Sequence, residues 1–187
     1  MKKLGIITSS VLVAMIGLNA TAESYYGIGF GSYELEADFG SIEPGLTGTN
    51  DIKGIEGYFG FEQNPYVAWE VRLGLGLGGD NTVFHLDGES MESDLEYTAN
   101  SYFSGYFRPQ YKARNVQFYG LLGYSSVSGE MSFGGESEDT SDDGVSYGFG
   151  AGVIFSKVNA INIEWKNLAK IDDGEITGVS LNFQRRF

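Results

Sequence analysis

Short segments in which apolar and polar residues alternate recur along the chain from residue 26 onward. A period of two is the signal of a β-strand, and no stretch of this region repeats with the period of a helix. We therefore expect eight strands. Seven of them have a clear apolar face, made by Tyr26, Ile28 and Phe30; Ile55, Phe59 and Phe61; Val67, Trp69, Val71, Leu73 and Leu75; Leu95, Tyr97, Ala99, Phe103 and Phe107; Tyr147, Phe149, Ala151, Val153 and Phe155; Ile161, Ile163 and Trp165; Val179, Leu181, Phe183 and Phe187. Residues 116–127 form the remaining strand, whose two faces the pattern does not distinguish.

The connections between the expected strands alternate in length. Tight turns are expected at residues 63–65, 112–115 and 157–159, and longer, loop-like segments at 36–51, 78–94, 128–144 and 168–174. Short turns at one end and longer loops at the other are typical of membrane barrels. The sequence thus predicts an all-β fold, an eight-stranded antiparallel up-and-down transmembrane β-barrel.

The two faces of the expected strands favour lipid as the surroundings. Eight strands enclose an interior wide enough only for side chains, and the faces rich in glycine and polar residues fit that space. The bulky apolar faces then point outward, where they would aggregate in water but are favourable in a bilayer. The alternative is a soluble, lipocalin-like barrel in which the bulky faces line a ligand cavity.

The first residues have the layout of a secretory signal peptide. Lys2 and Lys3 precede an apolar run over residues 4–18, and the small residues Ala20 and Ala22 follow it. We expect cleavage after residue 22, which leaves residues 23–187 as a single barrel domain. Export would then place the protein in the outer membrane.

Composition excludes several classes of function. The 187 residues contain 12 basic and 25 acidic side chains, a net charge of −13, which argues against nucleic-acid binding. The absence of cysteine excludes disulfides and zinc–thiolate sites. No phosphate-binding glycine motif is present, and we expect no cofactor.

Five charged residues fall on the inward faces of the expected strands: Glu56, Glu70, Arg72, Glu164 and Lys166. Charges in a narrow interior must pair, because burying them alone is costly. The simpler interpretation is a structural network of paired charges. The functional alternative is a gated path in which the pairs exchange partners.

The acidic residues of the long segments have two interpretations. They form a solvated, repulsive surface, or they bind Ca²⁺ or Mg²⁺ weakly and so bridge to lipopolysaccharide phosphates. Asp142, Asp143, Asp172, Asp173 and Glu175 are the candidates for the second, although their spacing is not that of an EF-hand.

The sequence does not indicate an enzyme. Its one histidine, His85, falls in a long segment without a recognisable nucleophile beside it. We therefore expect no catalytic residues.

Several motifs resemble those of the outer membrane protein β-barrel domain family, which includes the OmpA transmembrane domain, OmpX and opacity-type proteins. They are YYGIG at 25–29, YFRP at 106–109, FYGLLGY at 118–124, GFGAG at 148–152 and the final phenylalanine. The alternating Val179, Leu181, Phe183 and Phe187 resemble the family's C-terminal assembly signal, from which Arg185 departs. The resemblance implies insertion by the barrel-assembly machinery.

These observations predict a monomeric outer-membrane barrel with a structural or adhesin-like role. Its acidic loops would face the outside and its partners would be lipid, lipopolysaccharide and a surface ligand that the sequence does not name. A narrow channel for small solutes is the alternative.

Overall fold

The computed structural model describes residues 23–38, 46–79, 81–86, 89–133, 136–171 and 174–187; the expected signal peptide lies outside them. Over these residues the chain forms nine β-strands, and no helix there has the length and hydropathy to cross a bilayer. The strands are β1 (Glu23–Asp38), β2 (Thr47–Asn64), β3 (Val67–Gly79), β4 (Asn81–Leu86), β5 (Glu89–Ala113), β6 (Val116–Phe133), β7 (Glu136–Phe155), β8 (Asn159–Ile171) and β9 (Gly174–Arg186).

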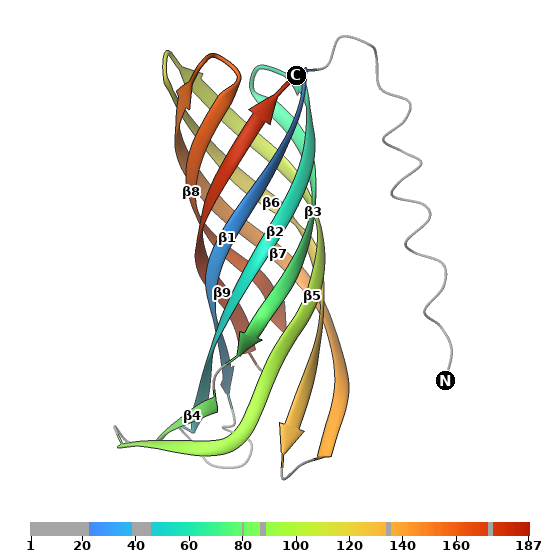
Figure 1. Cartoon of the computed structure of the whole chain (residues 1–187), viewed down its shortest axis with the longest axis vertical. Coiled ribbons are helices and arrows are strands. Elements are labelled where there is room, and N and C mark those ends of the chain that lie inside the picture. The colour runs from blue at the N-terminus through green and yellow to red at the C-terminus, as the bar shows by residue number, and fades with distance from the viewer. Residues whose placement is uncertain (1–22, 39–45, 80, 87–88, 134–135, 172–173) are drawn as a thin grey trace, which may run out of the picture.

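Eight of these strands close into an antiparallel barrel (Figure 1). Each pairs with its neighbours along the chain, and β1 also pairs with β9. The predicted eight-stranded up-and-down barrel is therefore confirmed. The short strand β4 was not predicted; it lies between β2 and β5 past the point where β3 stops pairing with β5.

The two ends of the barrel differ. The terminal end holds Glu23, Phe187 and the tight turns β2–β3, β5–β6 and β7–β8, all near their predicted positions (Figure 1). At the opposite, far end, β4 and the beginning of β5 sweep to one side, while the β6–β7 hairpin projects beyond the wall.

Most of the expected long loops are strand instead, and that part of the prediction is wrong. Segment 128–144 belongs to the β6–β7 hairpin, whose pairing continues to Phe133 and Glu136. Segment 78–94 contains β4 and the start of β5. Glycine, serine and acidic residues made these segments look like loops, yet pairing across each hairpin satisfies their backbone groups.

The outer face is apolar and the inner face polar, as predicted. Ile28, Leu73 and Ile163 are 61–66% exposed on the outside of the wall. In β6, whose faces were ambiguous, Gln117 and Tyr119 point inward. Because the bulky faces do not line a cavity, the lipocalin-like arrangement is excluded.

Glycines make room for tyrosine rings inside the barrel. Four inward tyrosines each lie directly opposite a glycine of the neighbouring strand: Tyr25 and Gly60, Tyr58 and Gly27, Tyr102 and Gly74, Tyr119 and Gly150. A Cβ atom at any of these glycines would overlap the facing ring. The inner glycines therefore allow a tight filling of the lumen.

Candidate functional site

A cluster of charged side chains fills the middle of the lumen, with Arg72 of β3 at its centre. The Arg72 side chain is fully buried. Its Nη1 lies 2.9 Å from Glu56 Oε1, and its Nε donates to Glu70 Oε1 at 2.5 Å. Two parallel hydrogen bonds of 2.6 and 2.9 Å join its guanidinium to Glu164 of β8. One cation thus holds three carboxylates from three strands, in part with the bidentate geometry that favours arginine.

Two further cations balance the charge of these carboxylates. Lys166 Nζ lies 2.5 Å from Glu56 Oε2, and Arg108 Nη1 lies 2.7 Å from Glu70 Oε2. We call the six side chains Glu56, Glu70, Arg72, Arg108, Glu164 and Lys166 the lumen ion network; its formal charges sum to zero. The structure thus brings together all five predicted interior charges and adds Arg108.

Arg108 was not among the predicted interior charges, although the sequence contains a signal for its position. It follows Tyr102, Ser104 and Tyr106 at every second position of β5, all on the face that points into the lumen. Strand alternation alone therefore places Arg108 inside the barrel.

Tyrosines supply the remaining hydrogen bonds of the network. The Tyr25 hydroxyl donates to Glu70 Oε2 at 2.7 Å, and the Tyr119 hydroxyl to Glu164 Oε1 at 2.5 Å. The Arg108 guanidinium stacks over the Tyr119 ring, 3.6 Å from its centroid. Because each buried carboxylate has several donors, the cost of removing its charge from water is offset.

A second group of charges lies at the terminal mouth of the lumen. Glu62 pairs with Lys112, and Glu62 Oε1 lies 3.2 Å from Arg186 Nε. Arg186 also donates to Gln117 Oε1 at 2.5 Å. We call Glu62, Lys112 and Arg186 the rim cluster. Its two cations were not among the predicted interior residues.

Toward the far end the lumen becomes apolar. The side chains that close it there, the apolar cluster, are Tyr33, Ile52, Val127, Leu168, Ala169 and Ile176, all at most 5% exposed. A register shift in β8 lets the consecutive residues Leu168 and Ala169 both join this cluster. Lys166 Nζ lies 5.6 Å from the centroid of the Tyr33 ring, so the apolar cluster borders the lumen ion network.

The candidate cation ligands do not form one site in the described residues. Asp142 and Asp143 lie in β7, not in a loop, so their side chains point to opposite faces of the sheet. Asp143 accepts a hydrogen bond from the Tyr124 hydroxyl. Glu175, in β9, accepts one of 2.8 Å from Asn167 Nδ2. Asp172 and Asp173 are outside the described residues, within which no three His, Asp or Glu side chains gather at metal-binding distance.

His85 connects three strands. Its Nδ1 lies 2.9 Å from Ser90 Oγ of β5, and its Nε2 lies 3.2 Å from Thr49 Oγ1 of β2. Both ring nitrogens are thus engaged by hydroxyl groups, and among the described side chains no carboxylate contacts the ring to orient it for catalysis. His85 therefore links β4 to its two neighbouring strands, β2 and β5.

The C-terminal residues form an apolar stripe on the outer face. Val179, Leu181 and Phe183 alternate outward along β9. The Phe187 N–H donates to the Ser24 carbonyl at 3.0 Å, and its ring lies 6.0 Å from that of Tyr26. Phe187 therefore joins the C-terminus to β1, while the role of the stripe as an assembly signal stays a prediction.

Comparisons with known proteins agree with this architecture. The family model described as "Outer membrane protein beta-barrel domain" matches residues 8–187. No curated protein matches the chain.

Among solved structures, the chain is similar to Ail, the attachment invasion locus protein of Yersinia pestis, with a TM-score of 0.59 and 20% identity over 89% of this chain and 99% of Ail. Another Ail structure holds the heparin analogue sucrose octasulfate. Neisserial surface protein A gives a TM-score of 0.61 and 9% identity over 87% of this chain and 97% of that protein. The N-terminal barrel of Pseudomonas aeruginosa OprF gives 0.53 and 11% over 86% and 97%. At these identities the likeness establishes the fold alone.

Proposed function

The chain belongs to the outer membrane protein beta-barrel domain family, and we propose that it is a closed, non-enzymatic barrel that binds a partner at the cell surface. Export by the signal peptide at residues 1–22 and insertion as a monomer by the barrel-assembly machinery are part of this proposal. The lipid around the barrel would contact its outward apolar face.

The observation that carries the surface role is the length of the strands. A transmembrane β-strand needs about 9–11 residues. β5 has 25 residues and β7 has 20. Since β3 and β5 stop pairing at Leu75 and Ser101, the far parts of β5, β6 and β7 continue past the common wall. A purely structural barrel has no need of this projection, which suits a binding element.

The projecting strands are acidic, which limits the chemistry of their partner. They contain Glu89, Glu92, Asp94, Glu96, Glu130, Glu136, Glu138, Asp139, Asp142 and Asp143. A positively charged partner fits this surface, whereas a polyanion like the one bound to Ail would be repelled. The similarity in fold therefore does not imply that this chain binds the same ligand.

The filling of the lumen supports a closed barrel over a channel. The rim cluster, the lumen ion network and the apolar cluster follow one another along its axis, and Arg72, Glu70 and Glu164 are at most 1% exposed. In planar bilayers the refolded protein should stay electrically silent. Regular single-channel steps would favour the narrow-channel alternative instead.

Two further experiments test location and binding. Cell fractionation should place the protein in the outer membrane and release it only with detergent; release by osmotic shock would contradict the proposal.

In nanodiscs the barrel should be retained on immobilised poly-lysine in a salt-dependent manner. The variant E136Q/E138Q/D139N should be retained more weakly, and retention on immobilised heparin instead would overturn the charge argument.

A further inference from the structure

Positive charge gathers at the terminal end of this acidic protein. The basic side chains there are Lys112, Arg114, Lys157, Arg185 and Arg186, against the carboxylates of Glu23, Glu62 and the C-terminal Phe187 in the described residues. Lys112 and Arg186 are engaged in the rim cluster. The side chains of Arg114, Lys157 and Arg185 are exposed and make no hydrogen bond or ion pair with any described residue. We call these three side chains the basic arc.

Two members of the basic arc occupy backbone positions that suit glycine better. Arg114 has a φ of 49° and Lys157 a φ of 59°, both in the left-handed region. The neighbouring Ser156 has a φ of 54°, and no other non-glycine residue of the described chain has a positive φ. Such backbone positions are uncommon for residues other than glycine and concentrate at functional sites.

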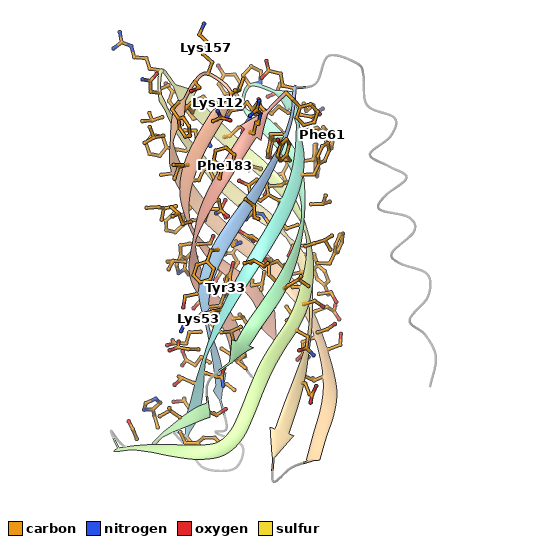
Figure 2. The ribbon with its side chains drawn as sticks, in the orientation of Figure 1. Tyr33, Lys53, Phe61, Lys112, Lys157 and Phe183 are labelled. Atoms are coloured by element: carbon orange, nitrogen blue, oxygen red, sulfur yellow. The ribbon has the colours of Figure 1, made fainter. Side chains whose placement is uncertain are left out.

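Aromatic rings mark the level at which the basic arc would meet a bilayer. Phe155 immediately precedes the turn with Lys157, and Phe183 lies two residues before Arg185. Their ring centroids are 6.4 Å apart, and both rings are about 40% exposed on the outer face. Outward aromatic residues form girdles at the headgroup level of membrane barrels. Lys157 extends past Phe183 from this end of the barrel (Figure 2). If the two rings lie at the headgroup level, its ammonium group would reach the lipid phosphates.

We propose that the basic arc binds the phosphate groups of anionic phospholipids in the leaflet around the terminal end. This inference rests on the proposed membrane insertion. The three cations are spread along the rim from the β5–β6 turn to β9. A layer of lipid headgroups can contact all three, whereas a single soluble phosphate cannot. Lys and Arg close to an anionic membrane surface each favour binding measurably.

Lipid selectivity around a tryptophan reporter tests the inference. The full-length chain with F155W in a W69F/W165F background would be refolded into vesicles that contain brominated phosphatidylglycerol or brominated phosphatidylcholine. Quenching of the reporter gives the relative binding constant of the two lipids beside Lys157 and Arg185. We expect a preference for phosphatidylglycerol that falls about fivefold for each cation removed in R114G, K157G and R185Q.

Matched variants separate charge from backbone strain. S156G relaxes the same turn without removing a charge, and K53Q removes an exposed cation of β2 toward the far end (Figure 2). Both should keep the preference. An undiminished preference in R114G/K157G, or a preference abolished by millimolar inorganic phosphate at constant ionic strength, would overturn the inference. In those cases quenching by brominated phosphatidylcholine would still show insertion. If neither brominated lipid quenched the reporter, the proposed function itself would be rejected.

Discussion

Arg72 is the residue on which the interior of the barrel depends most. Its guanidinium contacts Glu56, Glu70 and Glu164, and without it Lys166 and Arg108 alone remain to neutralise three buried carboxylates. Breaking a buried ion pair leaves an uncompensated charge, which costs more than the intact pair contributes.

The alternation of each strand predicted that these side chains share the lumen. It did not predict that Arg72 binds Glu164, 92 residues away, because that contact depends on strand register around the whole barrel.

R72A should therefore lower the free energy of unfolding by about 3–5 kcal/mol. Urea titration of the refolded barrel, followed by tryptophan fluorescence, measures the change. The control K53A removes an exposed cation of β2 and should have little effect. Replacing the partner as well, in R72M/E164Q, should restore part of the loss. Equal stability of R72A and K53A would show that the guanidinium is hydrated in solution and not buried.

At the scale of the strand, glycine and tyrosine act as cross-strand partners. The sequence predicted a compact glycine face, but the pairing of each ring with one glycine requires the register, which no local pattern contains. The β6 faces stayed ambiguous for a related reason: Leu121 points inward and Leu122 outward, so apolar residues occupy both sides. The extension of β6 and β7 into segment 128–144 was missed because turn-forming and acidic residues fill it.

G74A tests the packing of these pairs. The added methyl group would overlap the Tyr102 ring, whose hydroxyl donates to Glu56, so we expect a destabilisation of about 1–3 kcal/mol. G105A is the matched control in the adjacent strand β5, because a Cβ there has no neighbour within 4 Å. The comparison of urea midpoints measures the difference. If the two variants unfold alike, the Tyr102 ring does not lie over Gly74.

The whole molecule has two chemically distinct ends, and insertion through the membrane must assign one to each side. In membrane barrels the short turns lie on the periplasmic side. The acidic far end, opposite the tight turns, should therefore face the outside. The chain has no cysteine, so single cysteines can report this without background.

On intact cells, S90C and S141C should react with a membrane-impermeant maleimide, because both serines are exposed in the far-end part of the described structure. N115C, in the β5–β6 turn, should react only after the outer membrane is permeabilised. Labelling of N115C alone on intact cells would reverse the orientation and would place the basic arc outside.

Beyond the rim cluster at its mouth, the lumen is closed by two barriers in series, the lumen ion network and the apolar cluster, and this arrangement predicts how it responds to mutation. If the lumen ion network were the only gate, R72A would open a path and raise conductance in planar bilayers. The apolar cluster, however, lies beyond Lys166 and contains Ile52, Val127 and Ile176 at most 3% exposed. Apolar constrictions block channels by dewetting. We therefore expect R72A alone to remain silent, and V127S/I176S alone to remain silent because Arg72 still bridges the wall. The combined variant R72A/V127S/I176S should conduct, provided that heat-modifiability shows it to be folded. Steady currents from R72A alone would show that the apolar cluster is no barrier, and would favour a gate made of exchanging ion pairs.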